Sequence, residues 1–460
     1  MKKKSVGIIG AGIGGLTIAT LLSKRGYKVT IFEKEPIIGG RALSFKGEDI
    51  TIEKYKKYLK NFSMQLPFSE PDINTIFKQE MLKGYTLDLG YHAIGGGVLS
   101  NVNGVLKEFD EHVDFLESYV GYIDKNGWRF PFLSKKDKIK ILPKILRMLL
   151  ASEKTLQKLD SISMSETISK YGKGNMKLIL EVFSRSITTL NNLDEISTGE
   201  TFRAQRNLYK GSKPVGYPVG SLKNITDKFE QLIKENKGEI HLKSTVEKII
   251  IEKNKAIGLQ VNGKKYDFDI IISNILVQNL FEIADEKHFK KEYIKYIKSL
   301  NGTASLCAYY ALDKINPVLI GKTFHFIERN LGVEGEDAVG MIDLMPADPD
   351  SKLSPKNKHL IQSYIICTPK EAKDKTTLKK LKDSLDRNLK QIIPDYKDHL
   401  IWAIYPSIWH LDGVAKTIKK DKPDIETPIK NLYLVGDCVK APGIGFNCAL
   451  NSARILNDKI

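Results

Sequence analysis

The chain has few cysteines and no paired cysteine motif. Four occur in 460 residues: Cys307, Cys367, Cys438 and Cys448. No two of them form a CxxC pair, and no histidine accompanies them at the spacing of metal ligands. Such spacings indicate free thiols in a reducing compartment. We therefore expect neither a disulfide framework nor a metal site.

The sequence also lacks a long, uninterrupted apolar run. Lysines at 2–4 precede the uncharged run 6–22, which superficially resembles a secretory signal. That run carries too many glycines for a stable signal helix. No other segment approaches the roughly 18 apolar residues of a membrane span. The sequence predicts a cytoplasmic protein, either free or peripheral on the membrane.

Acidic residues are fewer than basic ones. Lys and Arg number 72 and Asp and Glu 55, which leaves a formal net charge of +17. This surplus favours anionic partners: a nucleic acid, a dinucleotide or an acidic membrane surface. Most lysines are scattered singly, as on any solvated surface. No nucleic-acid recognition motif accompanies the charge, so we expect no nucleic-acid partner.

A glycine-rich turn stands near the N-terminus. The apolar run 6–9 suits a buried parallel strand. Gly10, Gly12 and Gly15 follow it in the pattern G-x-G-x-x-G, with Gly14 in the same turn. The first glycine permits a sharp turn, the second lets a pyrophosphate approach the backbone, and the third lets the helix pack on the strand. The turn predicts a dinucleotide site.

Glu33 stands at the end of the next predicted strand. Gly26 is a natural cap for the helix, and residues 27–32 supply the strand. Glu33 comes 18 residues after Gly15. A carboxylate at this place accepts hydrogen bonds from ribose hydroxyls and repels a 2′-phosphate. FAD and NAD both fit the pattern, and NADP does not.

A second glycine pair, Gly39-Gly40-Arg41, follows this carboxylate after a short loop. Two glycines permit close backbone contact, and Arg41 offers a cation to a pyrophosphate. A surface turn that carries an arginine is the alternative interpretation.

The last thirty residues contain another strand–turn–helix pattern. The apolar run 432–435 leads into Gly436-Asp437, where a carboxylate can meet a ribityl or ribose hydroxyl. A turn ending at Gly445 opens a helix whose N-terminus carries partial positive charge. Aimed at the N1/C2=O edge of a flavin, it would stabilise the anionic reduced form. A plain strand–helix unit that caps the domain is the alternative.

Together these motifs resemble the FAD-dependent phytoene desaturase and amine oxidase superfamily, and the carotenoid desaturase/isomerase branch fits best. Residues 217–222, Tyr-Pro-Val-Gly-Ser-Leu, are similar to a Tyr-Pro-x-Gly-Gly segment of that family, with Ser221 in place of the second glycine. Val246 matches the position whose backbone meets the adenine. The motifs and the resemblance imply these FAD contacts: Gly10, Gly12, Gly14, Gly15, Glu33, Gly40, Arg41, Val246, Gly436, Asp437 and Gly445.

The alternation of strands and helices predicts an α/β fold with a Rossmann-like FAD-binding domain and an inserted α+β substrate domain. We expect a discontinuous FAD-binding domain formed by residues 1–95, 205–285 and 420–460. The substrate domain would comprise residues 96–204 and 286–419. Within it, 303–312 and 359–368 are β-rich, and 373–392 form a Lys-rich amphipathic helix.

Few side chains are needed for chemistry in such an enzyme, because flavin N5 accepts the hydride and the protein supplies position and dryness. Residues 88–92, Asp-Leu-Gly-Tyr-His, resemble the segment that passes the flavin face. His92 either donates a proton or orients the substrate near N5, or it is a structural histidine. An aromatic set either walls a substrate tunnel or amine cage, or belongs to the core: Trp402, Tyr405, Trp409 and Phe446.

Residues 134–160 interleave basic and apolar side chains. Such a stretch can lie in a membrane interface and admit a lipid substrate. It can also form an amphipathic lid or core helix with snorkelling lysines. Pro143 would kink this helix or begin a new one.

The resemblance implies an FAD-dependent oxidoreductase that desaturates, saturates or isomerises a long apolar, isoprenoid- or carotenoid-like substrate by hydride transfer at N5. The sequence indicates neither the electron acceptor nor the oligomeric state. An amine or porphyrinogen oxidase is the first alternative. A non-catalytic carrier similar to the prenyl-protein escort proteins is the second. Those carriers lack a working flavin site, so the intact glycine fingerprint argues against a carrier.

Overall fold

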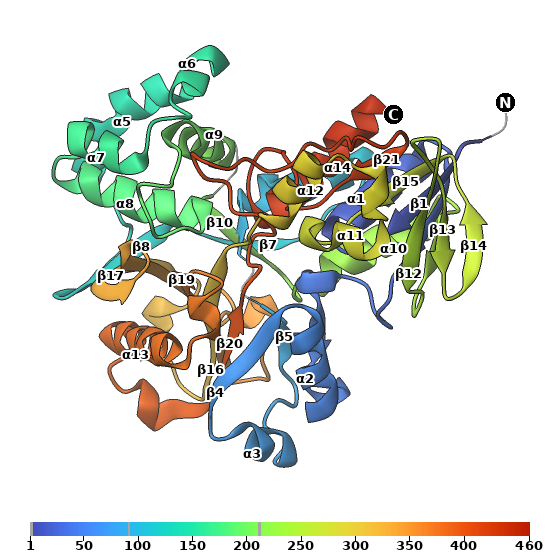
Figure 1. The fold of residues 1–460 in the computed structure, drawn as a ribbon. Helices are drawn as coiled ribbons and strands as arrows, with labels where there is room; N and C mark the ends of the chain where they lie inside the picture. Colours follow the sequence, from blue (N-terminus) through green and yellow to red (C-terminus); the bar gives the residue numbers. More distant parts are fainter. Residues whose placement is uncertain (1–2, 91–92, 210–212) are drawn as a thin grey trace.

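The structure is a computed structural model that describes residues 3–90, 93–209 and 213–460. It consists of a parallel sheet covered by helices, a large mixed sheet, and a lobe of helices (Figure 1). The first of these lies at the right of the view and the helical lobe at the upper left.

The parallel sheet joins strands from distant parts of the chain. Its order is β11 (Glu239–His241), β2 (Lys28–Phe32), β1 (Ser5–Ile9), β15 (Ile270–Ser273) and β21 (Leu432–Leu434). All four neighbouring pairs are parallel. Val6 and Ile8 are completely buried, as expected for a central parallel strand with both faces covered.

Helix α1 (Ile13–Lys24) is the centre of the packing on this sheet. Its residues from Ile13 to Ser23 are all buried, which suits a helix that is apolar around its circumference. The two chain ends meet here, because the hydroxyl of Tyr27 donates to the terminal carbonyl of Ile460 over 2.7 Å. Helices α14 (Gly445–Lys459) and α10 (Lys223–Glu235) pack against α1. The same hydrophobic core also includes residues of α4 (Asn101–Leu106), α11 (Leu280–Ile283) and α12 (Lys291–Lys298).

The large sheet separates two hydrophobic cores. Every residue of its strand β16 is buried, and alternate side chains enter opposite cores, Tyr309 on one side and Tyr310 on the other. The strand order is β4 (Met64–Glu70), β20 (Leu400–Ile408), β16 (Ala304–Leu312), β19 (His359–Cys367), β18 (Glu336–Asp343), β17 (Thr323–Val333), β8 (Val120–Asp124) and β9 (Gly127–Arg129).

Helix α13 (Lys375–Ile392) covers one face of this sheet, and α2 (Ile52–Asn61) and α3 (Ile73–Lys78) lie near its β4 edge (Figure 1). Asp374 caps α13 by accepting a hydrogen bond from the Thr377 N–H over 2.8 Å. The smaller sheets are β12 (Val246–Glu252), β13 (Lys255–Val261) and β14 (Lys264–Asp267); β6 (Ile94–Gly95), β10 (Val215–Pro218) and β7 (Phe115–Ser118); and β3 (Ser44–Lys46) with β5 (Thr86–Asp88).

The helical lobe contains the basic and apolar stretch 134–160. Its helix α5 continues through Pro143, so no new helix begins there. The helices of the lobe are α5 (Lys135–Leu149), α6 (Glu153–Lys158), α7 (Met164–Tyr171), α8 (Asn175–Thr188) and α9 (Thr198–Tyr209).

The predicted fold class is confirmed, since a parallel, helix-covered sheet carries the glycine fingerprint. The domain boundaries stay a prediction. Residues 64–70, expected in the FAD-binding domain, form the edge strand β4 of the large sheet. Helix α12, expected in the substrate domain, packs with the core of the parallel sheet.

Among the described residues, none of the helices combines the length and the apolar character needed to cross a bilayer. All four cysteines are buried, and none of them forms a disulfide. The described part of the chain contains no group of three or more His, Cys, Asp or Glu side chains placed to hold a metal ion.

Candidate active site

A cavity of about 460 Å³ lies at the carboxyl end of the parallel sheet. Ten of the eleven predicted cofactor residues line it: Gly10, Gly12, Gly14, Glu33, Gly40, Arg41, Val246, Gly436, Asp437 and Gly445. The structure therefore brings together residues from both chain ends and from the middle. The carboxyl end of a parallel sheet is where ligands bind in open α/β folds.

Gly15, the eleventh, lies behind the cavity and has a packing role. A Cβ atom on Gly15 would stand 2.2 Å from the carbonyl oxygen of Gly10, so only glycine lets α1 approach β1 this closely. A Cβ on Gly14 would stand 2.6 Å from Oδ1 of Asn274 and 2.9 Å from Cα of Gly436. The glycines thus allow the N-terminal turn, the C-terminal turn and Asn274 to pack closely against one another.

The N-terminus of α1 faces the cavity without a cap. Its N-cap is Gly12, no side chain of the described residues makes a capping hydrogen bond there, and its first turn contains no acidic residue. Free N–H groups and the helix dipole form a ready site for an anion. Gly40 approaches from the opposite side with a φ of +59°, and a Cβ there would lie 3.5 Å from Cα of Gly12. Two glycine backbones thus meet at the wall of the cavity, where no Cβ atom keeps a pyrophosphate away from either of them.

Glu33 is fixed at the end of β2 by two backbone donors. Its carboxylate accepts hydrogen bonds from the N–H of Ala11 over 2.8 Å and from the N–H of Glu35 over 2.9 Å. Burial raises the pKa of Glu33, while these two hydrogen bonds counteract that rise. Each carboxylate oxygen retains a lone pair for a further donor, such as a ribose hydroxyl.

Arg41 and Asp437 form an ion pair across the cavity, with Nη2 and Oδ1 2.6 Å apart. Nη1 of Arg41 also donates to the carbonyl of His410, and Oδ2 of Asp437 accepts from the N–H of Gly413 over 2.9 Å. Burial acts to raise the pKa of Asp437, but Arg41 outweighs it and holds that pKa below its ordinary value. The cation that the sequence assigns to a pyrophosphate is therefore already shared with a carboxylate.

A buried ion pair between Asp412 and Lys422 lies behind this site, and sequence reasoning missed it. Nζ of Lys422 stands 2.7 Å from Oδ2 of Asp412 and donates to the carbonyl of Asp437 over 2.6 Å. Oδ1 of Asp412 accepts from the N–H of Gly445 over 3.1 Å. The pair thus clamps the N-terminus of α14 to the strand end that carries Asp437. Both residues lie in irregular chain without a motif, so no sequence signal marks them.

Asn274, which follows strand β15, was also missed as a site residue. It lines the cavity and lies against Gly12 and Gly14. His92, for which the sequence leaves a catalytic and a structural role open, lies outside the described residues.

The predicted aromatic set does not gather in one place. Trp402 lies in the core on one side of the large sheet and Tyr405 in the core on the other. Trp409 packs at the edge of the second of these cores, and only Phe446 lines the cavity. The set therefore forms neither a tunnel wall nor an amine cage.

FAD fits the residues of this cavity. Glycine backbone and an uncapped helix suit a pyrophosphate, a carboxylate at the second strand end suits a ribose, and Val246 offers an apolar surface for an adenine. These features, on a parallel sheet with both chain ends contributing, define a flavin-dependent oxidoreductase.

The chain belongs to the flavin-containing amine oxidoreductase family, whose sequence model matches residues 13–458. FAD is therefore the cofactor, and the protein is an FAD-dependent oxidoreductase. The predictions of superfamily, cofactor and enzymatic class are confirmed.

Three similar proteins illustrate the relationship. An uncharacterised protein of Methanocaldococcus jannaschii is 26% identical over 95% of this chain and 94% of its own length. A 4,4′-diapophytoene desaturase of a Methylomonas species is 27% identical over 68% of this chain, which spans only 62% of that desaturase. The solved structure of an oxidoreductase from Methanosarcina mazei has a TM-score of 0.73 at 24% identity, covering 99% of this chain and 100% of that one.

Proposed function

We propose that this flavin enzyme desaturates, saturates or isomerises a long apolar substrate of the isoprenoid or carotenoid type. Bound FAD supplies an acceptor or donor of hydride, and the chain supplies position and exclusion of water. The similarity to a desaturase that acts on a diapophytoene supports this substrate class.

The observation that carries the proposal is a second, larger cavity of about 770 Å³ in the helical lobe. Its interior residues are buried and mostly apolar, among them Leu156, Leu180 and Ile187. Two hydroxyls of the interior, those of Thr167 and Thr198, bond to each other over 2.7 Å and leave little for a polar ligand. Such a chamber suits a hydrocarbon chain.

Helix α8 connects this chamber to the flavin site. Ile179, Leu180, Phe183 and Ile187 of α8 line the chamber. Thr189 directly follows the end of α8, and its hydroxyl donates to Thr303 Oγ1 over 2.8 Å. Thr303 Oγ1 also accepts a hydrogen bond from the N–H of Asp412. The chamber wall therefore ends at the residues that hold the N-terminus of α14.

An amine oxidase remains the alternative, because the family is named for amines. The charge of the chamber disfavours a cationic substrate. Its described lining contains three cations, Lys138, Arg147 and Lys213, and no carboxylate. A protonated amine would meet repulsion there.

Anaerobic spectroscopy of the flavin tests the proposal. We expect a polyisoprenoid hydrocarbon to change the flavin absorbance, starting either from oxidised or from chemically reduced enzyme, while primary and polyamines leave it unchanged. The Ile179→Trp variant, which fills the chamber, should slow this change at least tenfold, and Val318→Ser, at an exposed site elsewhere, should not. Bleaching by amines alone would replace the proposal with the alternative.

We propose that the ten predicted residues that line the cavity contact FAD, whereas Gly15 acts through packing. We also keep the three-segment FAD-binding domain as a proposal. The parallel sheet, which draws strands from residues 5–32, 239–273 and 432–434, supports it.

Contact with a membrane at α5 is a further part of the proposal. Four apolar side chains recur at helical spacing and are exposed: Ile139 by 71%, Leu142 by 50%, Leu146 by 47% and Leu150 by 82%. They form one stripe beside basic residues, as in helices that lie in a membrane interface. We expect the enzyme to sediment with phosphatidylglycerol vesicles, and the Leu142→Ser/Leu146→Ser variant to remain in solution. Equal sedimentation of variant and wild type would reject this contact.

A further inference from the structure

The cations of the large chamber lie at its exposed rim, while its depth is apolar. Lys138 and Arg147 are exposed, and Tyr119 beside them is 47% exposed. The deep end, by contrast, is closed by completely or almost completely buried residues such as Leu156 and Thr198. The chamber therefore has a charged end and an apolar end.

Two of the cations converge on one aromatic ring. Nζ of Lys213 donates to the hydroxyl of Tyr119 over 2.7 Å and lies 3.9 Å from the centre of a Tyr119 ring. Nζ of Lys138 lies 5.4 Å from the centre of that ring. The hydrogen bond from Lys213, together with both charges, lowers the pKa of Tyr119. The rim is thus electropositive.

No carboxylate offsets this charge. Within the described residues, Lys138, Arg147 and Lys213 form no ion pair with Asp or Glu, and no acidic side chain lines the chamber. Elsewhere in the same lobe the basic side chain of Arg203 bonds to Asp160, Glu153 and Glu200. Three uncompensated cations on an apolar chamber call for an anion at the rim.

We propose that the chamber binds an amphiphile with a long apolar tail and a phosphate or carboxylate end group, with the tail in the chamber and the end group at Lys138 and Lys213, which meet at the ring of Tyr119. This inference rests on the proposed function and narrows its substrate class, because the long apolar molecule would also carry an anionic end group. One molecule enters the chamber, either from solution or from a bilayer.

Calorimetric titration of the holoenzyme tests the charged end, with dodecyl phosphate below its micelle concentration and dodecanol as the uncharged probe. We expect dodecyl phosphate to bind at least tenfold tighter than dodecanol. The Lys138→Gln/Lys213→Gln variant should remove about tenfold of the affinity for dodecyl phosphate and leave that for dodecanol within twofold, because solvent screening limits each contact. Equal affinities of the two probes for the wild type would overturn the inference.

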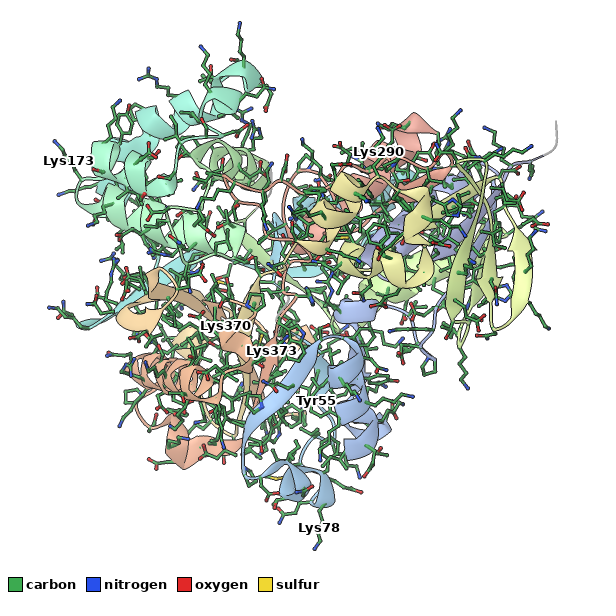
Figure 2. All side chains as sticks on the ribbon, viewed as in Figure 1. Tyr55, Lys78, Lys173, Lys290, Lys370 and Lys373 are labelled. Carbon is green, nitrogen blue, oxygen red and sulfur yellow. The ribbon has the colours of Figure 1, made fainter. Side chains whose placement is uncertain are left out.

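A charge-matched control separates the rim from the general basic surface. Lys154 and Lys173 are exposed residues of the same lobe and do not line the chamber, and Figure 2 labels Lys173 at the outer edge of the lobe. The Lys154→Gln/Lys173→Gln variant should bind dodecyl phosphate as the wild type does. An equal loss in both double variants would mean that net charge alone attracts the probe.

The apolar end has its own test. Ile179→Trp should weaken the binding of both probes at least tenfold, and an unchanged thermal melting temperature checks that the variant is folded. Should that variant not fold, Phe202→Trp, at another lining position, takes its place. Undiminished binding of dodecyl phosphate would place the probe on the surface and overturn the inference.

Vesicles distinguish a lipid surface from a single amphiphile. Suppose that the Lys138→Gln/Lys213→Gln variant lost only its binding to phosphatidylglycerol vesicles and kept its affinity for dodecyl phosphate. The cations would then bind a membrane surface, and the inference would fail. An enzyme whose flavin responds to polyisoprenoid hydrocarbons but which binds both probes equally would keep the proposed function and reject the inference. An enzyme that binds dodecyl phosphate more tightly than dodecanol, but whose flavin responds only to amines, would reject the proposed function and keep the anionic end of the chamber.

Discussion

Ser221 occupies a backbone conformation that favours glycine. It is completely buried and has a φ of +83°, in the left-handed region where a Cβ costs about 1–2 kcal/mol. The similar segment of the desaturase superfamily carries glycine at this position. The chain thus tolerates local strain directly before α10.

The Ser221→Gly variant should be more stable than the wild type. The variant loses the hydrogen bond that the N–H of Lys223 donates to Ser221 Oγ over 3.3 Å, and glycine loses extra entropy on folding. Relief of strain outweighs both losses, so we expect the free energy of unfolding to rise by about 0.5 kcal/mol. Urea unfolding of the holoenzyme measures it. Ser163→Gly is the control: Ser163 has a φ of −71° and caps α7 through the N–H of Glu166, so its loss should destabilise. Destabilisation by both variants would contradict the argument.

Asp88 is a buried carboxyl group at the start of the segment that leads to His92. It accepts hydrogen bonds from the hydroxyls of Ser44 and Tyr217 and from the N–H of Leu222. Burial raises the pKa of Asp88 from 3.8 to about 6, against the effect of these hydrogen bonds. The folded protein therefore keeps a proton that the unfolded chain has already released.

The sign of the pH dependence follows from that difference. Between about pH 4 and pH 6 the native state binds more protons than the unfolded state, so stability falls as pH rises, by about 3 kcal/mol in total, and levels off above pH 6. The Asp88→Asn variant should lack this slope. Unfolding free energies of both proteins at several pH values from 4 to 7 would show it. Parallel curves would mean that Asp88 ionises normally.

At the scale of elements, the N-terminus of α14 depends on a buried ion pair. Removing Lys422 alone leaves Asp412 charged and uncompensated in the interior, so Lys422→Met should cost about 3 kcal/mol of unfolding free energy. The double variant Lys422→Met/Asp412→Asn should recover part of that loss. Chemical denaturation measures both, and FAD retained after gel filtration reports whether α14 keeps its place. Additive effects of the two substitutions would contradict a coupled pair.

The strand–turn–helix units at both chain ends could be predicted because their signals are local. Glycine spacing, apolar runs of four and a strand-terminal acid all lie within a few residues of one another. The ion pair between Asp412 and Lys422 could not be predicted, because its role arises only when an irregular segment of the chain folds back on α14. For the aromatic set, the core alternative holds at Trp402 and Tyr405, and the tunnel or cage does not form. These two residues are three apart on strand β20, and odd spacings point to opposite faces.

At the scale of the whole molecule, the fingerprint predicts a strand–helix–strand unit of β1, α1 and β2, whereas no local pattern predicts the large sheet. Strand β4 pairs with β20 across more than three hundred residues, Glu70 opposite Ala403. No local pattern marks such a partner. The sequence therefore assigns residues 64–70 to the FAD-binding domain, whereas their strand lies at the edge of the large sheet.

FAD should stabilise the whole molecule, because its predicted contacts join three distant stretches of chain. A ligand that binds only the folded state adds about 2.7 kcal/mol when present at 100 times its dissociation constant. We expect the apoprotein to melt at a lower temperature and added FAD to restore the loss. Gly12→Ala, whose Cβ would stand 2.8 Å from Nδ2 of Asn274, should melt like the apoprotein with or without FAD. An equal rise with FAD in that variant would contradict the site.

The meeting of Tyr27 with Ile460 has a consequence for biosynthesis. The ribosome makes β1 and α1 more than four hundred residues before α14. Until α14 has been made, α1 lacks a helix that helps to bury it. The nascent chain should therefore not retain flavin before α14 has formed, and a product that stops before β21 should emerge colourless.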